Sequence, residues 1–191
     1  IDVFEQVLPY ISEKCILSDI TSVKNGIKEY YLGTGRRFVS THPMFGPTFA
    51  NIRELAGQSA IIIKQSDEEG KAFFREFYES LKLNIFEYTF IEHDKTIAYS
   101  LSIPFASTIV FASVMKRQDA PGTTFKKHLK IAEGLFSEND YLISEILFNK
   151  YSLEQLNLIY NKMGDLIEIV KNKDNEEMQA LLNEMRENIK H

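Results

Sequence analysis

A histidine in a stiff loop is the strongest chemical signal in the sequence. His42 stands in the run Thr41-His-Pro-Met-Phe-Gly-Pro47, directly after the apolar residues Phe38 and Val39, which predict a strand. Ligands of α/β proteins bind at the carboxyl ends of strands, and the prolines restrict the movement of this loop. Because an imidazole titrates near neutral pH, His42 could transfer a proton in a reaction. The alternative is a histidine with a structural role only.

Two hydroxyl side chains follow a second predicted strand, Cys15–Asp19. Thr21 and Ser22 stand just beyond its carboxyl end, where a hydroxyl could reach a substrate hydroxyl or a cofactor. The same two residues could instead cap a helix with an apolar face over residues 27–31, and taken alone the sequence favours this capping role. Glycines at 33 and 35 predict the end of that helix.

Helix and strand patterns alternate over residues 1–91. Helices are predicted at 2–12 and 67–81, and strands at 59–64 and 84–90, in addition to those above. This alternation is typical of a parallel α/β sheet. The helix at 67–81 carries an apolar stripe that should be buried: Phe73, Phe74, Phe77, Tyr78 and Leu81.

Residues 92–191 show only helical patterns and are predicted to be a separate helical domain. Its helices should lie at about 92–116, 123–136, 138–149, 152–172 and 174–190, with Ser137 and Ser152 as N-caps. His93 and Asp94 open the first helix, where His93 could support a site residue. The helix over about 97–115 is too apolar for the surface of a monomer, so we expect a homodimer formed by the helical domain. A monomeric helical core is the alternative.

The composition is that of an ordinary globular protein and excludes several classes. Hydrophobic residues make up 44% of the 191 residues, enough for a substantial core. The net charge of -5 argues against nucleic acid as a partner. Cys15 is the single cysteine and cannot form an internal disulfide, so a reducing cytoplasm is expected. No uninterrupted apolar run reaches the roughly 18 residues of a membrane helix, and no spacing typical of a metal site is present.

Several runs, taken together, resemble the prephenate dehydrogenase family. Asp19-Ile-Thr-Ser-Val-Lys24 and then His42-Pro-Met-Phe-Gly-Pro47 look like the paired motif of that family, and the second run is the more specific. His93-Asp94 followed by Ser100–Phe105 resembles its histidine-aspartate pair and proline-containing helix. Phe125–Ala132 resembles the segment that carries its substrate-binding cations. The resemblance extends over essentially the whole chain.

The resemblance implies an NAD- or NADP-dependent enzyme that converts prephenate to 4-hydroxyphenylpyruvate in tyrosine biosynthesis. Hydride leaves the hydroxyl-bearing ring carbon for the cofactor, a histidine takes up the hydroxyl proton, and the ring carboxylate leaves as CO2. On this sequence the histidine is His42, and Ser22 lies beside it and the substrate hydroxyl. Thr21, Ser22 and Pro43 are the implied cofactor contacts. The implied fold is the later part of a Rossmann-type nucleotide-binding domain followed by a helical dimerisation domain.

The two carboxylates of prephenate require cations or strong hydrogen-bond donors. Lys126, Lys127, His128 and Lys130 stand together in the segment that resembles the substrate-binding stretch. The family often has an arginine where Lys130 aligns, and lysine lacks the bidentate geometry of arginine. Many members have a histidine where this chain has Ser102, which we take as a further substrate contact. The alternative for the lysine cluster is an ordinary solvated helix face.

The sequence does not contain the fingerprint Gly-x-Gly-x-x-Gly that binds a pyrophosphate. We therefore expect the chain, which opens at Ile1, to be the later part of a longer enzyme and to be weakly active or inactive alone. The runs Asn84–Phe90 and Ala120–Phe125 most resemble versions from Bacteroides-type bacteria. Three alternatives stay open: an arogenate dehydrogenase, a non-catalytic dimerisation or ligand-binding module, and a 3-hydroxyacid dehydrogenase with Lys95 or Lys127 as catalytic lysine. The histidine motif speaks against the last.

Overall fold

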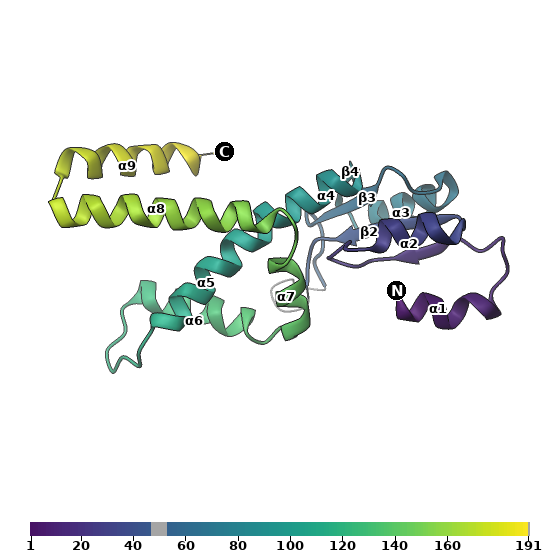
Figure 1. The fold of residues 1–191 in the computed structure, drawn as a ribbon, viewed down its shortest axis with the longest axis horizontal. Coiled ribbons are helices and arrows are strands. Elements are labelled where there is room, and N and C mark those ends of the chain that lie inside the picture. The colour runs from purple at the N-terminus through teal and green to yellow at the C-terminus, as the bar shows by residue number, and fades with distance from the viewer. Residues whose placement is uncertain (47–52, 191) are drawn as a thin grey trace.

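The computed structural model describes residues 1–46 and 53–190, which form a small sheet with helices and then an all-helical part (Figure 1). The first part contains α1 (Asp2–Val7), β1 (Leu17–Asp19), α2 (Ile27–Thr34), β2 (Phe38–Pro43), β3 (Ser59–Ile63), α3 (Glu68–Ser80) and β4 (Asn84–Tyr88). The second contains α4 (Phe90–Ile97), α5 (Ile103–Val114), α6 (Thr123–Leu135), α7 (Asp140–Leu147), α8 (Ser152–Asn172) and α9 (Asn175–Asn188). The predicted fold class, α/β followed by all-α, is confirmed.

The sheet is mixed, so the prediction of a parallel sheet was wrong in one pairing. The strands lie in the order β1-β2-β3-β4; β1 pairs with β2, and β3 with β4, in parallel, whereas β2 and β3 are antiparallel. A parallel pair requires a crossover, usually a helix, that returns the chain to the other end of the sheet. The described residues between β2 and β3 contain no helix, and the Met44 amide donates to the Ser59 carbonyl at 2.8 Å.

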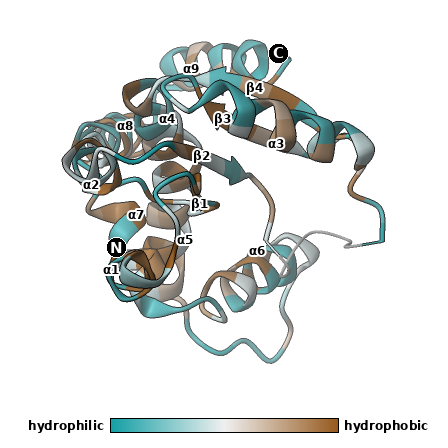
Figure 2. Cartoon of the chain, turned by 90° about the vertical axis from the view of Figure 1, so that its right-hand side faces the viewer, coloured by the Kyte–Doolittle hydropathy of each residue, from teal (hydrophilic) through white to brown (hydrophobic). Residues whose placement is uncertain are grey.

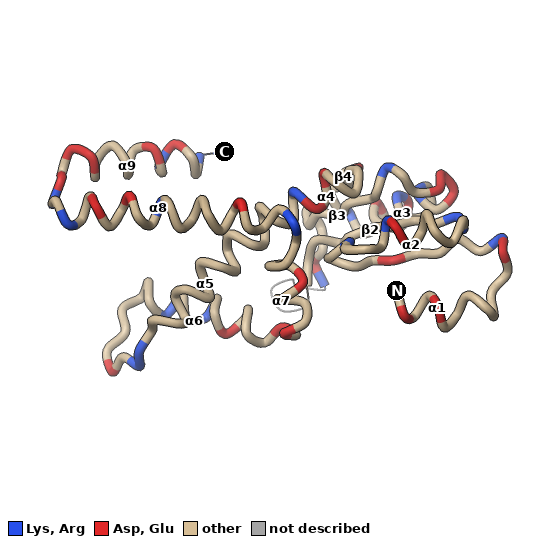
Figure 3. The backbone as a smooth tube through the Cα atoms, in the orientation of Figure 1, with Lys and Arg blue, Asp and Glu red and all other residues tan. Residues whose placement is uncertain are grey.

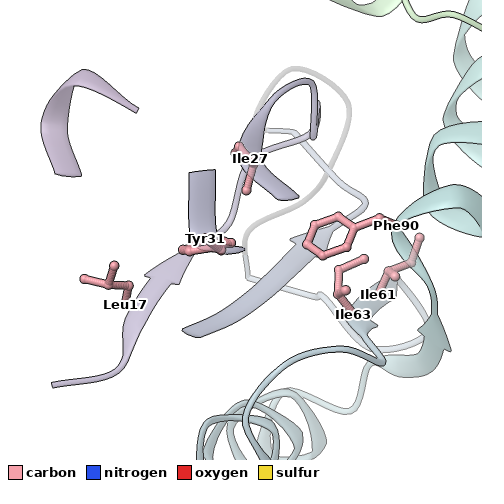
Figure 4. Close-up of a cluster of buried hydrophobic side chains, with 6 residues drawn as sticks. All are labelled: Leu17, Ile27, Tyr31, Ile61, Ile63 and Phe90. Carbon is pink, nitrogen blue, oxygen red and sulfur yellow. The ribbon is translucent and has the colours of Figure 1, made fainter. Parts of the chain in front are cut away.

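Two apolar clusters cover the two faces of β3, which was correctly predicted as a strand. Successive side chains of a strand point to opposite faces. Ile61 and Ile63 join a cluster with α1, α2 and the first residue of α4 (Figure 4), whose buried members are Leu17, Ile27, Tyr31, Ile61, Ile63 and Phe90. On the other face, Ala60 and Ile62 pack with Tyr78 and Leu83 beside α3. Phe90 therefore fixes the start of the helical part against the sheet.

Helix α2 begins later than the predicted cap. Its N-cap is Gly26, in a left-handed conformation (φ 72°) that glycine adopts without strain, so Thr21 and Ser22 do not cap it. Its end at Gly35, also left-handed, is confirmed. The six residues from Ile20 to Asn25 therefore form an irregular loop at the carboxyl end of β1, which is where ligands of α/β sheets bind.

The long apolar helix runs continuously from Phe90 to Val114 through a π-helical turn at Ala98–Ser102. Pro104 has no N–H to donate to the carbonyl of Ser100, and a local π turn accommodates this loss. By length and composition alone this helix could cross a membrane. In the structure, α6, α7 and α8 pack around it, and its strongly apolar α5 segment stands out in Figure 2.

The packing of α3 on the sheet depends on a glycine, which gives a first prediction. A Cβ at Gly70 would lie 2.7 Å from Cβ of Val39, whereas a Cβ at Gly164 on α8 would meet nothing within 4 Å. Gly70→Ala should therefore lower the free energy of unfolding by about 1–3 kcal/mol through overpacking. Gly164→Ala is the matched control and should leave it unchanged or raise it by up to about 1 kcal/mol. Urea unfolding measures both, and equal effects of the two substitutions would contradict this packing.

Candidate active site

A cavity of about 710 Å³ lies where the sheet meets the helical part. Its sheet side consists of the loop after β1 and the end of β2, and its helical side consists of residues from α5, α6 and α7. The volume is in the range that accommodates a small organic molecule. The lining residues are Ile20, Ser22, His42, Pro43, Met44, Phe45, Gly46, Gln58, Leu101, Pro104, Phe105, Thr108, Ile131, Leu135, Glu138, Leu142 and Ile146. Pro47, the last residue of the histidine motif, lies outside the described residues.

Strand β2 carries His42 into this cavity at the point where the strand ends. His42 pairs with Ile61 of β3 in the antiparallel register, and its side chain is largely buried, with 4% of the residue exposed. One ring nitrogen faces the protein: Nδ1 lies 3.0 Å from Nε2 of His93 on α4. The two rings meet edge to face with their centroids 5.2 Å apart. The histidine predicted for proton transfer is thus held at a cavity wall with Nδ1 already engaged.

The surroundings keep both histidines neutral. Burial, the nearby His93 and the charge of Lys24 together lower the pKa of His42 to about 3, although Asp19 acts in the opposite direction. Burial also lowers the pKa of His93, although its hydrogen bond to Asp94 acts to raise it. A neutral imidazole can accept a proton, so His42 is in the state that a general base requires.

A buried ion pair fixes the loop after β1 against β2. Nζ of Lys24 contacts the Asp19 carboxylate and donates to the Thr41 carbonyl at 2.7 Å. The Tyr31 hydroxyl donates to the other oxygen of Asp19 at 2.8 Å. Burial opposes ionisation of Asp19, but the charge of Lys24 and these hydrogen bonds hold its pKa below the usual value. Neither Lys24 nor Tyr31 was singled out as a site residue from the sequence, because the strand and loop spacing does not reveal their side-chain contacts.

Ser22 and Thr21 have different surroundings. Ser22 lines the cavity and is half-buried. The Thr21 hydroxyl donates to Oδ1 of Asp19 at 2.8 Å and lies 3.0 Å from the Val23 carbonyl, and Thr21 does not line the cavity. The structure therefore brings Ser22, Pro43 and His42 together, and it places Thr21 behind them as part of the loop.

The predicted substrate ligands of the helical part are not at the cavity. The predicted carboxylate ligands of α6, namely Lys126, Lys127, His128 and Lys130, are exposed and none lines it. Ser102 is fully buried between helices, where its hydroxyl lies 2.7 Å from that of Ser152 and 3.3 Å from the Ile146 carbonyl. Ser102 therefore joins the helices and does not contact the cavity. Ser152 is the first residue of α8 and not its N-cap, which explains how it can make this contact.

Known proteins share both the sequence and the fold. Residues 1–82 match the model of the family described as prephenate dehydrogenase, nucleotide-binding domain. The resemblance to the prephenate dehydrogenase family is confirmed. The resemblance to Bacteroides-type versions of that family stays a prediction.

Relatives of this family resemble the chain over nearly all of its length. A probable arogenate/prephenate dehydrogenase of Methanocaldococcus jannaschii is 26% identical, over 95% of this chain and 44% of that protein. The T-protein of Enterobacter agglomerans is 24% identical, over 94% of this chain and 50% of that protein. The chain therefore spans about half the length of these curated relatives.

Solved structures of two such enzymes have the same fold. Prephenate dehydrogenase from A. aeolicus, in complex with hydroxyphenyl propionate and NAD+, has a TM-score of 0.79 at 17% identity, over 97% of this chain and 70% of that one. Synechocystis arogenate dehydrogenase has a TM-score of 0.74 at 19% identity, over 98% of this chain and 73% of that one. The mixed sheet with its appended helices is thus the fold of this family.

The low pKa of His42 predicts a loss of stability in acid. The unfolded chain binds a proton at this histidine below its unperturbed pKa of about 6.5, whereas folded His42 does so only near pH 3. Between these values the unfolded state binds more protons, so the free energy of unfolding falls as the pH falls. From pH 6.5 to 5 this residue should account for about 2 kcal/mol.

Urea unfolding at the two pH values tests this. His42→Asn should reduce the difference between them, since asparagine does not titrate. The exposed His128→Asn is the matched control and should keep the wild-type difference. An unchanged pH dependence in His42→Asn would show that this histidine can be protonated in the fold.

Proposed function

We propose that the protein is a prephenate dehydrogenase, which oxidises and decarboxylates prephenate to 4-hydroxyphenylpyruvate with NAD or NADP. The observation that carries the proposal is the placement of His42. Its imidazole is neutral, it is held through Nδ1, and it lies at the wall of a largely apolar cavity beside Ser22. The sequence and fold shared with this family give the proposal its substrate.

His42 would act as the general base through Nε2, because Nδ1 is engaged by His93. The C4 hydroxyl of prephenate gives up its proton to Nε2 while hydride leaves C4. The ring carboxylate then leaves as CO2, and its electron pair makes the ring aromatic. The proton held on His42 returns to the resulting phenolate oxygen, so no net proton is released. Ser22, at the same wall, would hydrogen-bond the reacting hydroxyl and orient it.

The residues at the strand ends fit the nicotinamide end of the cofactor. Ser22 and Pro43 line the cavity at the carboxyl ends of β1 and β2, which are parallel and adjacent, as at the nucleotide sites of α/β sheets. Thr21 would contribute through the loop that it stabilises. When bound, the cofactor accepts the hydride. The sequence holds no glycine-rich pyrophosphate loop, so this chain accounts for the nicotinamide contacts only.

The substrate carboxylates require cations or strong hydrogen-bond donors. None of the described lining residues is a lysine or an arginine. We propose Lys126, Lys127, His128 and Lys130 for this role. Supporting it, Ile131 and Leu135 of the same helix line the cavity, and Lys127 lies one helical turn before Ile131 on the same face.

A second candidate is arogenate dehydrogenase, which one observation favours. Arogenate carries an amine on its side chain, and a carboxylate beside it would be a favourable partner. Glu138 lines the cavity from the segment between α6 and α7. The two substrates differ only in that side chain, so the proposed roles of His42 and Ser22 are the same for both.

A homodimer formed by the helical part, which we take to be residues 92–191, is also part of this proposal. In the apolar helix Phe90–Val114, only 22% of a strongly apolar stretch of 18 residues is buried in one copy of the chain. Its α5 segment carries no charged side chain (Figure 3). Val114 at its end is 72% exposed, and α8 exposes Leu158, Met163 and Ile167. Burying such a surface against a second copy is favourable. It would also account for these apolar side chains in a cytoplasmic protein without a membrane.

The function is tested by the formation of reduced nicotinamide. The protein encoded by the complete gene should turn over prephenate with NAD+ or NADP+, and the preferred cofactor follows from comparing them. His42→Asn should reduce kcat by about 100- to 10,000-fold through loss of the base. Ala72→Glu, on the exposed surface of α3, should keep the wild-type rate.

A parallel assay with arogenate separates the two candidates. A kcat/KM that is higher for arogenate, and that falls selectively for arogenate in Glu138→Gln, would favour the second candidate. A folded protein that binds the substrate carboxylates but converts neither compound would instead be a non-catalytic binding module.

The homodimer is tested by analytical ultracentrifugation. The chain of 22.1 kDa should sediment at twice its mass. Ile167→Glu should shift it toward the monomer, since burying an unpaired carboxylate at this exposed apolar position of the interface is strongly unfavourable. Ala72→Glu again serves as the control, because it adds the same charge on α3. A wild-type chain that sediments as a monomer would contradict the dimer.

A further inference from the structure

His42, the catalytic base of the proposed function, is the first member of a chain of polar contacts that continues through His93 to Asp94. Nδ1 of His42 lies 3.0 Å from Nε2 of His93, and Nδ1 of His93 lies 3.2 Å from Oδ1 of Asp94. His93 is fully buried and Asp94 nearly so. Nothing in the proposed reaction requires this pair to touch the substrate.

The donor and acceptor in each of these two contacts follow from the hydrogen-bonding capacities of a carboxylate and an imidazole. An ionised carboxylate can only accept, so Nδ1 of His93 must carry the proton that it shares with Asp94. A neutral imidazole has one donor and one acceptor, so Nε2 of His93 is then an acceptor. Nδ1 of His42 must therefore donate to it. The lone pair of His42 is left on Nε2, the nitrogen that is not engaged by His93.

We propose that His93 and Asp94 are positioning residues, which fix His42 in its Nδ1–H tautomer and stabilise its charge when it takes the substrate proton. The second half of this inference rests on the proposed function, whereas the first half concerns the chain by itself.

The position of this pair in the fold supports the inference. α4 is anchored at its start by Phe90 in the core and by a capping box between Thr89 and Glu92. The Asn149 side chain donates to the Asp94 carbonyl at 2.9 Å and holds the same turn from the side of α7 and α8. Because His93 is fully buried, water does not compete for its ring nitrogens.

The charges around His42 show why an anion behind it is needed. The groups that act on its ring are His93, Lys24 and Asp19, and Lys24 opposes its protonation. Asp19 is already paired with Lys24 and accepts a hydrogen bond from the Tyr31 hydroxyl. The Asp94 carboxylate accepts from the ring of His93, and it also interacts electrostatically with Lys24 without a direct contact. Through the ring of His93, the Asp94 carboxylate can orient His42 and stabilise the imidazolium when it forms.

The tautomer can be measured directly on this chain by ¹⁵N NMR of the imidazole nitrogens. The sequence has only four histidines, so single substitutions assign each signal. Wild-type His42 should be mostly in the Nδ1–H form. In Asp94→Asn, the side-chain amide can donate to Nδ1 of His93. Nε2 of His93 would then carry its proton and donate to Nδ1 of His42, which should shift His42 to the Nε2–H form. Asp165→Asn, exposed on α8, is the matched control and should leave the tautomer unchanged.

A pair of substitutions at position 93 separates positioning from packing. Glutamine has a carbonyl that can still accept from His42, whereas leucine is of similar size and cannot. His93→Gln should keep the Nδ1–H form of His42, and His93→Leu should lose it. This pair also tests the inference if Asp94→Asn does not fold. A wild-type His42 in the Nε2–H form, or a tautomer that neither Asp94→Asn nor His93→Leu changes, would overturn the inference.

The kinetic test uses the protein from the complete gene. Asp94→Asn should lower kcat on the order of 100-fold or more, with a much smaller change in KM, because the base is held in the wrong tautomer. His93→Gln should retain more activity than His93→Leu. If the tautomers behave as expected but wild type turns over neither substrate, the proposed function fails and the positioning stands. If wild type is active but Asp94→Asn keeps its rate and its tautomer, the positioning fails and the function stands.

Discussion

The ammonium of Lys24 lies buried between two strand ends, and the arrangement of the cavity depends on it. It contacts the carboxylate at the end of β1 and the carbonyl of Thr41, the residue just before His42. Removing one partner from a buried ion pair typically costs about 3–5 kcal/mol, because the other charge is left unpaired in a medium that solvates it poorly. The loop after β1 and the end of β2 are therefore held together, and Ser22 and His42 are brought to the same wall. The same positive charge makes protonation of the two histidines unfavourable.

The sheet and the helical part each contribute half of the site. β2 supplies His42, while α4 supplies the histidine that contacts it, and α5 to α7 supply the apolar wall. Phe90 connects the halves, since it is both the first residue of α4 and a member of the core cluster beneath the sheet. A displacement of α4 against the sheet would therefore separate the two histidines before it opened the cavity.

Much of the fold could be predicted from the sequence because it depends on local patterns. The alternation of helix and strand, the strand around Ile61 and the helix beginning after Asp67 follow from periodicity and capping. The direction of β3 could not, because strand pairing depends on how the chain returns. The predicted burial of Phe73 and Phe77 was also wrong, since they are 64% and 48% exposed and only part of the stripe packs on the sheet.

In the candidate site, too, residues marked by a local sequence pattern could be predicted, whereas contacts between distant segments could not. His42 and Ser22 both follow an apolar strand, which is a local signal, and both line the cavity, although taken alone the sequence favoured a capping role for Ser22. Ser102 was placed at the site by alignment, but its hydroxyl pairs with Ser152, fifty positions away in sequence. Lys24 and His93 contact segments that are distant in sequence, so spacing and composition do not reveal their partners, although His93 was named as a residue that could support a site residue.

The antiparallel pairing of β2 with β3 has a consequence for how this cavity can change over time. The connection between them leaves the sheet at Met44 and returns at Gln58, and both residues border the cavity. Its two ends are closed by the bond between the Met44 amide and the Ser59 carbonyl. Substitutions at Phe45, Gly46 or Gln58, which line the cavity and lie outside the strands, would reshape its wall without altering the register of a strand. Substrate preference could thus diverge among descendants of this chain while the sheet and its histidine stay as they are.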